Sequence, residues 1–123
     1  MSDRSKNASV TPGEPNPAEW LTVPDLVEIL GEPVGRVHRL FDDHHLIGTR
    51  RFGALRVPAQ FVQDGAPLKS LRGTATVLLD EGFTLDEVID WLLTDTEALG
   101  HPPIESLIAG RKSEVRAAAL MLG

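Results

Sequence analysis

Cysteine and long apolar runs are both absent from the 123 residues of this chain. The lack of cysteine excludes disulfides, thiolate metal sites and cysteine nucleophiles. It does not distinguish one cellular compartment from another. Because no apolar run approaches the roughly 18 residues that a membrane helix needs, the sequence predicts no membrane span. Residues 1–17 lack the apolar stretch of a secretory signal. We therefore expect a cytoplasmic protein.

The motifs that accompany common enzyme chemistry are also missing. The sequence contains no G-x-x-x-x-G-K-[ST] phosphate loop, no G-x-S-x-G nucleophile elbow and no H-E-x-x-H zinc motif. His44 and His45 are neighbours at a predicted helix end and would point in different directions, so we expect no metal site. A chain of this length is also short for a large catalytic cavity. The prediction is a protein that is not an enzyme and has no cofactor.

Acidic and basic residues are segregated along the chain. The formal net charge is −6, from 18 Asp and Glu against 12 Lys and Arg, which argues against nucleic-acid binding over the whole surface. Residues 36–56 nevertheless hold five arginines and two acidic residues, whereas residues 80–97 hold seven acidic residues and no basic one. Such charge runs are usually solvated faces. A nucleic-acid site would have to be local, and residues 36–56 are the candidate.

Composition divides the chain into three parts. Residues 1–17 are rich in Ser, Pro, Asn and Gly, contain almost nothing to bury, and are interpreted as a flexible, disordered tail. Residues 18–62 form the candidate binding domain. Residues 63–123 read as a helical C-terminal region that can hardly build a core of its own. We expect this region to pack on the preceding domain and on a second copy of the chain, giving a homodimer.

Two short helices joined by a tight turn are predicted at about 22–30 and 34–43. Thr22 with Asp25 three residues later has the pattern of a capping box, and Gly31 after the last apolar residue fits a helix end. The second helix carries three apolar residues at the spacing of one buried face. Its opposite face is therefore expected to be exposed.

This exposed face holds the first candidate DNA-binding residues, which are Gly35, Arg36, His38 and Arg39. An arginine at such a position can form two hydrogen bonds to a guanine in the major groove. Gly35, near the helix N-terminus, would allow close approach to a phosphate. The alternative is that these arginines only solubilise an ordinary helix.

Residues 46–58 read as a strand, a turn containing glycine, and a second strand. This ribbon carries Arg50, Arg51 and Arg56, which can reach the DNA backbone or minor groove while the helix occupies the major groove. Adjacent residues of a strand point to opposite faces, so Arg50 and Arg51 need not both touch DNA. Proximity to the turn favours Arg51 and Arg56. The layout predicts a winged helix-turn-helix that binds double-stranded DNA, in a mainly α fold with a small β-ribbon.

The stretch LTVPDLVEILGEPVGRVHRLFDDHHLIGTRRFGALRVP resembles the small winged-helix modules of the excisionase and MerR type. The remainder, with SLRGTATVLLDEGFTLDEVIDWLL and HPPIESLIAGRKSEVRAAALML, is similar to the C-terminal region of an actinobacterial family of small winged-helix DNA-binding proteins. The resemblance covers about residues 20–122. It implies a transcriptional regulator, and the mycobacterial representative of the family is a substrate of a membrane-anchored Ser/Thr protein kinase, phosphorylated in its N-terminal tail.

The tail of this chain offers Ser2, Ser5, Ser9 and Thr11 to such a kinase. Their surroundings do not reproduce the family phosphosite, so no position transfers by resemblance. We take Thr11 as the candidate, because a flexible tail is accessible and a phosphate adds nearly two negative charges, which would repel DNA beside a basic face. The alternative is an unmodified tail.

The C-terminal segment GHPPIESLIAGRKSEVRAAALML is also similar to the toxin-binding segment of certain antitoxins. In this alternative the helical region, with its acidic surface, binds a partner toxin while the N-terminal half binds operator DNA. Co-purification with a small partner would favour the antitoxin, and a monomer or homodimer that binds DNA alone would favour the regulator.

Overall fold

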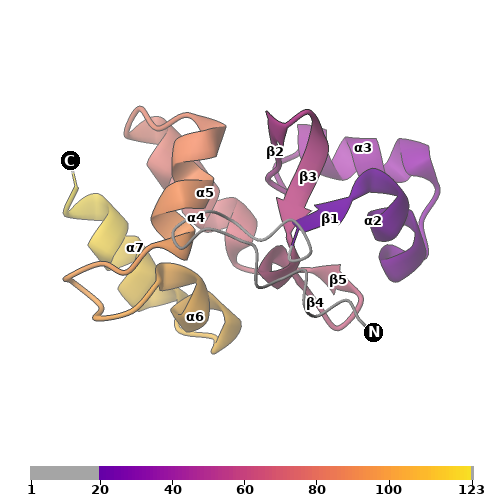
Figure 1. The fold of residues 1–123 in the computed structure, drawn as a ribbon. Coiled ribbons are helices and arrows are strands. Elements are labelled where there is room, and N and C mark those ends of the chain that lie inside the picture. Colours follow the sequence, from indigo (N-terminus) through magenta and orange to yellow (C-terminus); the bar gives the residue numbers. More distant parts are fainter. Residues whose placement is uncertain (1–19, 123) are drawn as a thin grey trace, which may run out of the picture.

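The computed structural model describes residues 20–122 and contains a helix-turn-helix, a small sheet and a group of four helices (Figure 1). The elements are β1 (Trp20–Thr22), α2 (Val23–Leu30), α3 (Val34–Asp42), β2 (Thr49–Phe52), β3 (Ala54–Pro58), a 3-10 turn (Ala59–Phe61), β4 (Val62–Gln63), β5 (Ala66–Pro67), α4 (Leu71–Asp80), α5 (Leu85–Leu93), α6 (Pro103–Ile108) and α7 (Lys112–Leu120). The predicted mainly helical fold with a small ribbon is confirmed. Within residues 20–122, no helix is long and apolar enough to cross a bilayer.

Local sequence signals determine how α2 begins and ends. The Thr22 hydroxyl accepts a hydrogen bond from the Asp25 N–H (3.2 Å), and the Asp25 carboxylate accepts one from the Thr22 N–H (3.0 Å). These bonds from Thr22 lower the pKa of Asp25. Gly31 ends the helix in the left-handed conformation, with φ 67°. The predicted capping box is therefore confirmed.

The wing is a three-stranded antiparallel sheet with the order β1-β3-β2, where the sequence predicted two strands. The additional strand is β1, which pairs Trp20 with Pro58 and Leu21 with Val57. The prediction of a strand starting at Leu46 is wrong, because the strand begins at Thr49 and the buried residues before it form an irregular connection. Three residues are too few for β1 to show an alternating pattern.

A second hairpin precedes α4, in a segment where the sequence predicts a helix over residues 67–81. That predicted start is wrong: helix α4 begins at Leu71, because β4 pairs with β5 in the register Gln63 to Ala66. The turn between them is Asp64–Gly65, with φ 54° and 76°. Asp-Gly is a preferred pair for two-residue hairpin turns with positive φ.

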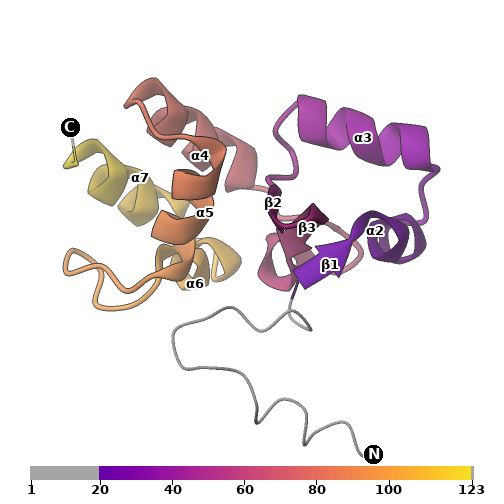
Figure 2. The ribbon, with the colours of Figure 1, turned by 45° about the horizontal axis from the view of Figure 1, so that its top comes forward.

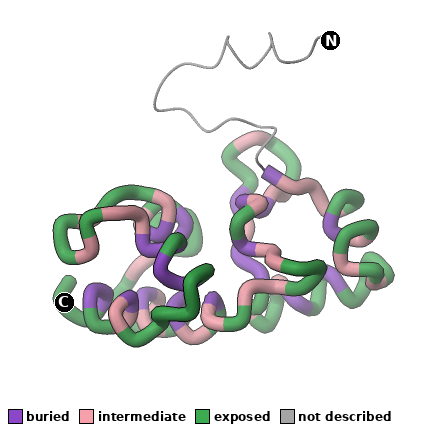
Figure 3. Tube along the Cα trace, turned by 90° about the horizontal axis from the view of Figure 1, so that it is seen from below, coloured by how far each residue is buried: buried purple, intermediate pink, exposed green. Residues whose placement is uncertain are grey.

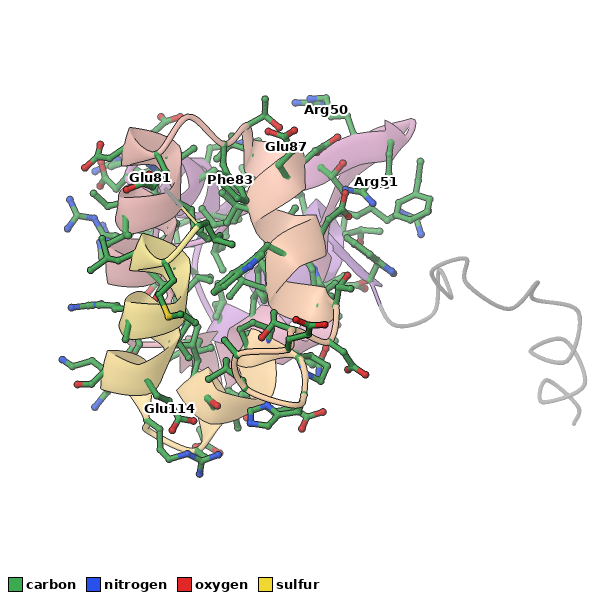
Figure 4. All side chains as sticks on the ribbon, turned by 90° about the vertical axis from the view of Figure 1, so that its left-hand side faces the viewer. Arg50, Arg51, Glu81, Phe83, Glu87 and Glu114 are labelled. Atoms are coloured by element: carbon green, nitrogen blue, oxygen red, sulfur yellow. The ribbon has the colours of Figure 1, made fainter. Side chains whose placement is uncertain are left out.

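Side-chain hydrogen bonds cap the start of α5 and link α6 to α7. The sequence pattern of Thr84 and Glu87 predicts a capping box at the start of α5, and the hydrogen bonds between them confirm it. Glu114 accepts hydrogen bonds from the Ser106 hydroxyl (2.7 Å) and the Arg111 Nε (3.1 Å), and both bonds lower the pKa of Glu114. This residue links the start of α7 to α6 on the lower part of the molecule in Figure 4.

Both halves of the chain contribute to one cluster of buried side chains. Figures 1 and 2 show the C-terminal helices beside the wing, on the side away from α2 and α3. Buried segments alternate with exposed ones in both halves (Figure 3). The cluster includes Leu26, Val37, Val57, Phe61, Leu71, Leu78, Ile89, Leu107 and Val115. The winged helix and the helical region thus share a core.

Candidate nucleic-acid interface

Helix α3 exposes one face because its apolar residues are buried on the other. Val37 is 0% exposed and Leu40 is 8% exposed. The residues expected to face DNA all lie on the exposed side: Gly35, Arg36, His38 and Arg39. The structure therefore brings these four predicted residues together on one helix.

Gly35 is not required by packing within the protein. A Cβ atom built at this position has no heavy atom within 4 Å, and the backbone does not adopt a positive φ. Gly48 is the contrasting case, since a Cβ there would lie 2.9 Å from the Phe41 side chain and 3.0 Å from the Arg56 carbonyl oxygen. Packing within the protein therefore requires a glycine at position 48 but not at position 35. At position 35 the missing side chain leaves room for a binding partner to approach the backbone of α3.

Arg36 lies on a flank of α3. It lines a surface cavity of about 340 Å³ together with Leu40 and Asp43, which follow at helical spacing along the same side. Arg39 does not line this cavity, and the helical repeat places it closer to the middle of the exposed face. The two arginines therefore occupy different parts of the exposed surface of α3.

Arg51 is held between the wing and α5. Its Nη1 donates to the Asp90 carboxylate at 2.9 Å, and its Nη2 is 3.9 Å from the Asp86 carboxylate. The Thr49 hydroxyl accepts from the Nε of Arg51 at 3.2 Å, and the guanidinium lies 5.7 Å from the centre of the Trp20 ring. The structure does not bring Arg51 to the exposed face of α3.

Arg56 and Arg50 differ in how accessible they are. Arg56 is half-buried on the central strand, with its guanidinium 5.7 Å from the centre of the Phe52 ring and its Nε buried. Arg50 is exposed and extends at the upper outline of the molecule (Figure 4). It forms no ion pair with another residue of the described chain. Arg50 is therefore the wing arginine that is both exposed and without an ion pair among the described residues.

The acidic run at 80–97, read from the sequence as a solvated face, has a specific contact in the structure. Asp86 and Asp90 lie on consecutive turns of α5 and both approach Arg51. The exposed arginines of α3 have no such partner among residues 20–122. Among the described residues, positive charge therefore has no acidic partner on α3 and at Arg50, and is neutralised where the wing meets α5. No three His, Asp or Glu residues in the described part are grouped to hold a metal ion.

Two family models match the chain in sequence order. The model described as "DNA-binding protein Rv2175c, wHTH domain" matches residues 15–62, and the model described as "Rv2175c C-terminal domain of unknown function" matches residues 68–123. The chain belongs to the Rv2175c family.

Two comparisons with individual Rv2175c proteins agree with this membership. The "DNA-binding protein Rv2175c" of Mycobacterium tuberculosis is 36% identical over 78 residues, which are 63% of this chain and 53% of the relative. The matched part thus spans about half the length of this curated relative. The "NMR structure of Rv2175c" superposes with a TM-score of 0.76 at 29% identity, over 93% of this chain and 84% of that chain.

In this member of the Rv2175c family, sequence reasoning did not find Lys69 or His45, which line the same cavity as Arg36. Lys69 belongs to the segment after the second hairpin, far from α3 in the sequence. No periodic pattern links the two segments, so only the folded chain places them together. The cavity joins the winged helix to the start of the C-terminal region.

Proposed function

We propose that this Rv2175c family member binds double-stranded DNA and acts as a transcriptional regulator in the cytoplasm without enzymatic activity. Helix α3 would enter the major groove, and strands β2 and β3 of the wing would contact the DNA backbone. One observation carries the proposal. The exposed cations Arg36, Arg39 and Arg50 lie on the recognition helix and the wing and have no acidic partner among the described residues.

The positions of these residues suggest a division of roles. Arg39, on the middle of the exposed face, reads a base edge, with His38 beside it. Arg36 on the flank and Arg50 on the wing contact phosphates, which position the protein without reading sequence. Gly35 allows the backbone of α3 to approach a phosphate closely. A bidentate contact from arginine to guanine contributes about 1 to 3 kcal/mol of discrimination between bases.

A selection from random-sequence DNA at physiological salt tests this proposal directly. We expect enrichment of a short motif, and for that motif Arg39→Ala should lower affinity by about 1 to 3 kcal/mol and relax one base preference. Lys112→Ala is the control, because Lys112 is exposed at the start of α7, a helix that lies across the wing from α3 (Figures 1 and 2). If the wild-type protein binds no DNA even at low salt, the proposal is refuted.

Phosphorylation of the tail is a second part of the proposal. Thr11 lies outside the described residues, and it remains the candidate because a phosphate there would add nearly two negative charges. Incubation with a Ser/Thr kinase followed by mass spectrometry should locate the modified residue. Thr11→Ala should abolish the modification, and the phosphorylated wild-type protein should bind DNA more weakly than the unmodified one. Modification at another residue, or unchanged affinity, would contradict this part.

A partner bound by the C-terminal region, as in an antitoxin, is the second candidate function. It is favoured by the exposed apolar end of α7, where Leu120, Met121 and Leu122 are 60%, 77% and 49% exposed. Exposed apolar groups of this kind often mark interaction sites. Light scattering of the purified protein distinguishes a homodimer from a monomer, and a monomer that gains a small protein partner in co-expression would support the antitoxin.

A further inference from the structure

We infer that Lys69, at the entry to the C-terminal region, binds a phosphate of the DNA backbone together with Arg36 and His45. This inference rests on the proposed function and extends the interface beyond the winged helix. The three residues line a surface cavity of about 340 Å³. Its remaining lining consists of Leu40, Asp43, Pro67 and Leu68.

The charges of the cavity favour an anion. Arg36 and Lys69 are exposed and form no ion pair with any residue in the part of the chain that the structure covers. Asp43 is the one acidic residue of the lining. The Nε of Arg72 donates to the main-chain oxygen of Asp43 at 2.9 Å, which places another cation beside this acid. The local charge is thus positive on a protein with a formal net charge of −6.

Both walls of the cavity are fixed by main-chain hydrogen bonds. The His45 N–H donates to the Leu40 carbonyl oxygen at 2.9 Å, and the Leu68 N–H donates to the Phe61 carbonyl oxygen at 2.9 Å. The bond from Arg72 to Asp43 joins the end of α3 to the first turn of α4. Because these segments are already ordered, binding an anion requires little rearrangement of the backbone.

The position of the cavity identifies the anion. One wall is the flank of α3, and the flanks of a helix in the major groove face the sugar-phosphate strands. A phosphodiester group on one of these strands therefore comes opposite Arg36 and Lys69 when the exposed face of α3 meets the bases. The C-terminal region then takes part in DNA binding through its first residues.

The test measures DNA affinity against salt concentration for the full chain, Lys69→Gln and Lys112→Gln. Losing one phosphate contact reduces the slope of log K against log salt by about 0.9, so the loss of affinity between 50 and 200 mM salt should become about 3.5-fold smaller for Lys69→Gln. The reduction should be the same on specific and random DNA. Lys112→Gln should match the wild type, and thermal melting should show that both variants fold.

The outcomes separate the inference from the proposed function. If the wild type binds DNA and Lys69→Gln keeps its affinity and slope, the inference is wrong while DNA binding by α3 stands. If the wild type binds no DNA, the proposed function fails. Inorganic phosphate alone, followed by the NMR amide signals of residues 43–45, 68 and 69, should cause little change at millimolar concentration. Saturation by phosphate at micromolar concentration would mean a site for a small anion and would overturn the inference.

Discussion

Replacing Arg51 with alanine should weaken the fold and leave DNA affinity nearly unchanged. The Arg51 guanidinium lies 2.9 Å from Asp90, but the two side chains are 28% and 60% exposed, so solvent screens this ion pair to about 0.2 to 1 kcal/mol. The contact with Trp20 at 5.7 Å adds about 0.5 to 1 kcal/mol. The expected loss is about 1 to 2 kcal/mol, or about 5 to 10 °C in melting temperature for a domain of roughly 100 residues.

Arg50→Ala is the matched control, because it removes the same side chain from the neighbouring position on the same strand. Arg50 is exposed and has no ion pair with another described residue, so its removal should change stability by less than about 0.5 kcal/mol. It should instead weaken binding to all DNA sequences. We therefore expect calorimetry to show a loss of stability mainly for Arg51→Ala, and fluorescence anisotropy to show a loss of DNA affinity mainly for Arg50→Ala.

A double-mutant cycle with Asp90→Asn isolates the contact itself. If Arg51 and Asp90 interact as the structure has them, the coupling free energy should be about 0.5 kcal/mol, and the loss caused by Arg51→Ala should be smaller when Asp90 is already replaced. The assignment is refuted if Arg51→Ala leaves the melting temperature unchanged and weakens DNA binding as much as Arg50→Ala does. That result would place Arg51 on the DNA, as the sequence alone suggested.

Three further changes test other features of the structure. Gly35→Ala should stabilise the fold by about 0.5 kcal/mol, because alanine favours a helix, and should weaken DNA binding if the backbone approaches a phosphate; equal or tighter binding would contradict that role. Gly48→Ala should destabilise the fold by about 1 to 3 kcal/mol, since its Cβ would meet Phe41 and a carbonyl oxygen, and denaturant titration would show this. Because the folded-state pKa of Asp25 is lowered, its charged form stabilises the fold above about pH 4 and this contribution is lost as pH falls through the folded pKa. The stability difference between the wild type and Asp25→Asn should therefore shrink in acid, and a constant difference would count against the cap.

Local signals allowed much of the first half to be predicted from the sequence. Thr22 with Asp25 gave the start of α2, and Gly31 gave its end, because the capping hydrogen bonds span only a few residues. The spacing of Val37 and Leu40 gave the buried face of α3, and hence the exposed arginines opposite. These features depend on residues within one or two helical turns.

Features that depend on distant residues could not be predicted in the same way. Strand β1 is defined by its pairing with β3, more than thirty residues away. The contact of Arg51 with Asp90 spans 39 positions, and an arginine on a ribbon gives no local sign of which partner it meets. The hairpin before α4 is different, because its Asp64–Gly65 turn is a local signal, although no strands were predicted on either side of it.

The distribution of charge limits how strongly one copy of this protein can hold DNA. Three proposed phosphate contacts, from Arg36, Arg50 and Lys69, give a salt slope of about −2.7, whereas proteins with six to ten such contacts show far steeper dependence. Asp86 and Asp90 on α5 also make the neighbouring surface repel phosphates, which would confine DNA to the side of α3. One copy should therefore bind weakly at physiological salt, and tight binding requires either a strong base contact from Arg39 or a second copy on an adjacent half-site. If the purified protein binds its selected motif tightly as a monomer, base contacts supply the affinity that three phosphate contacts do not.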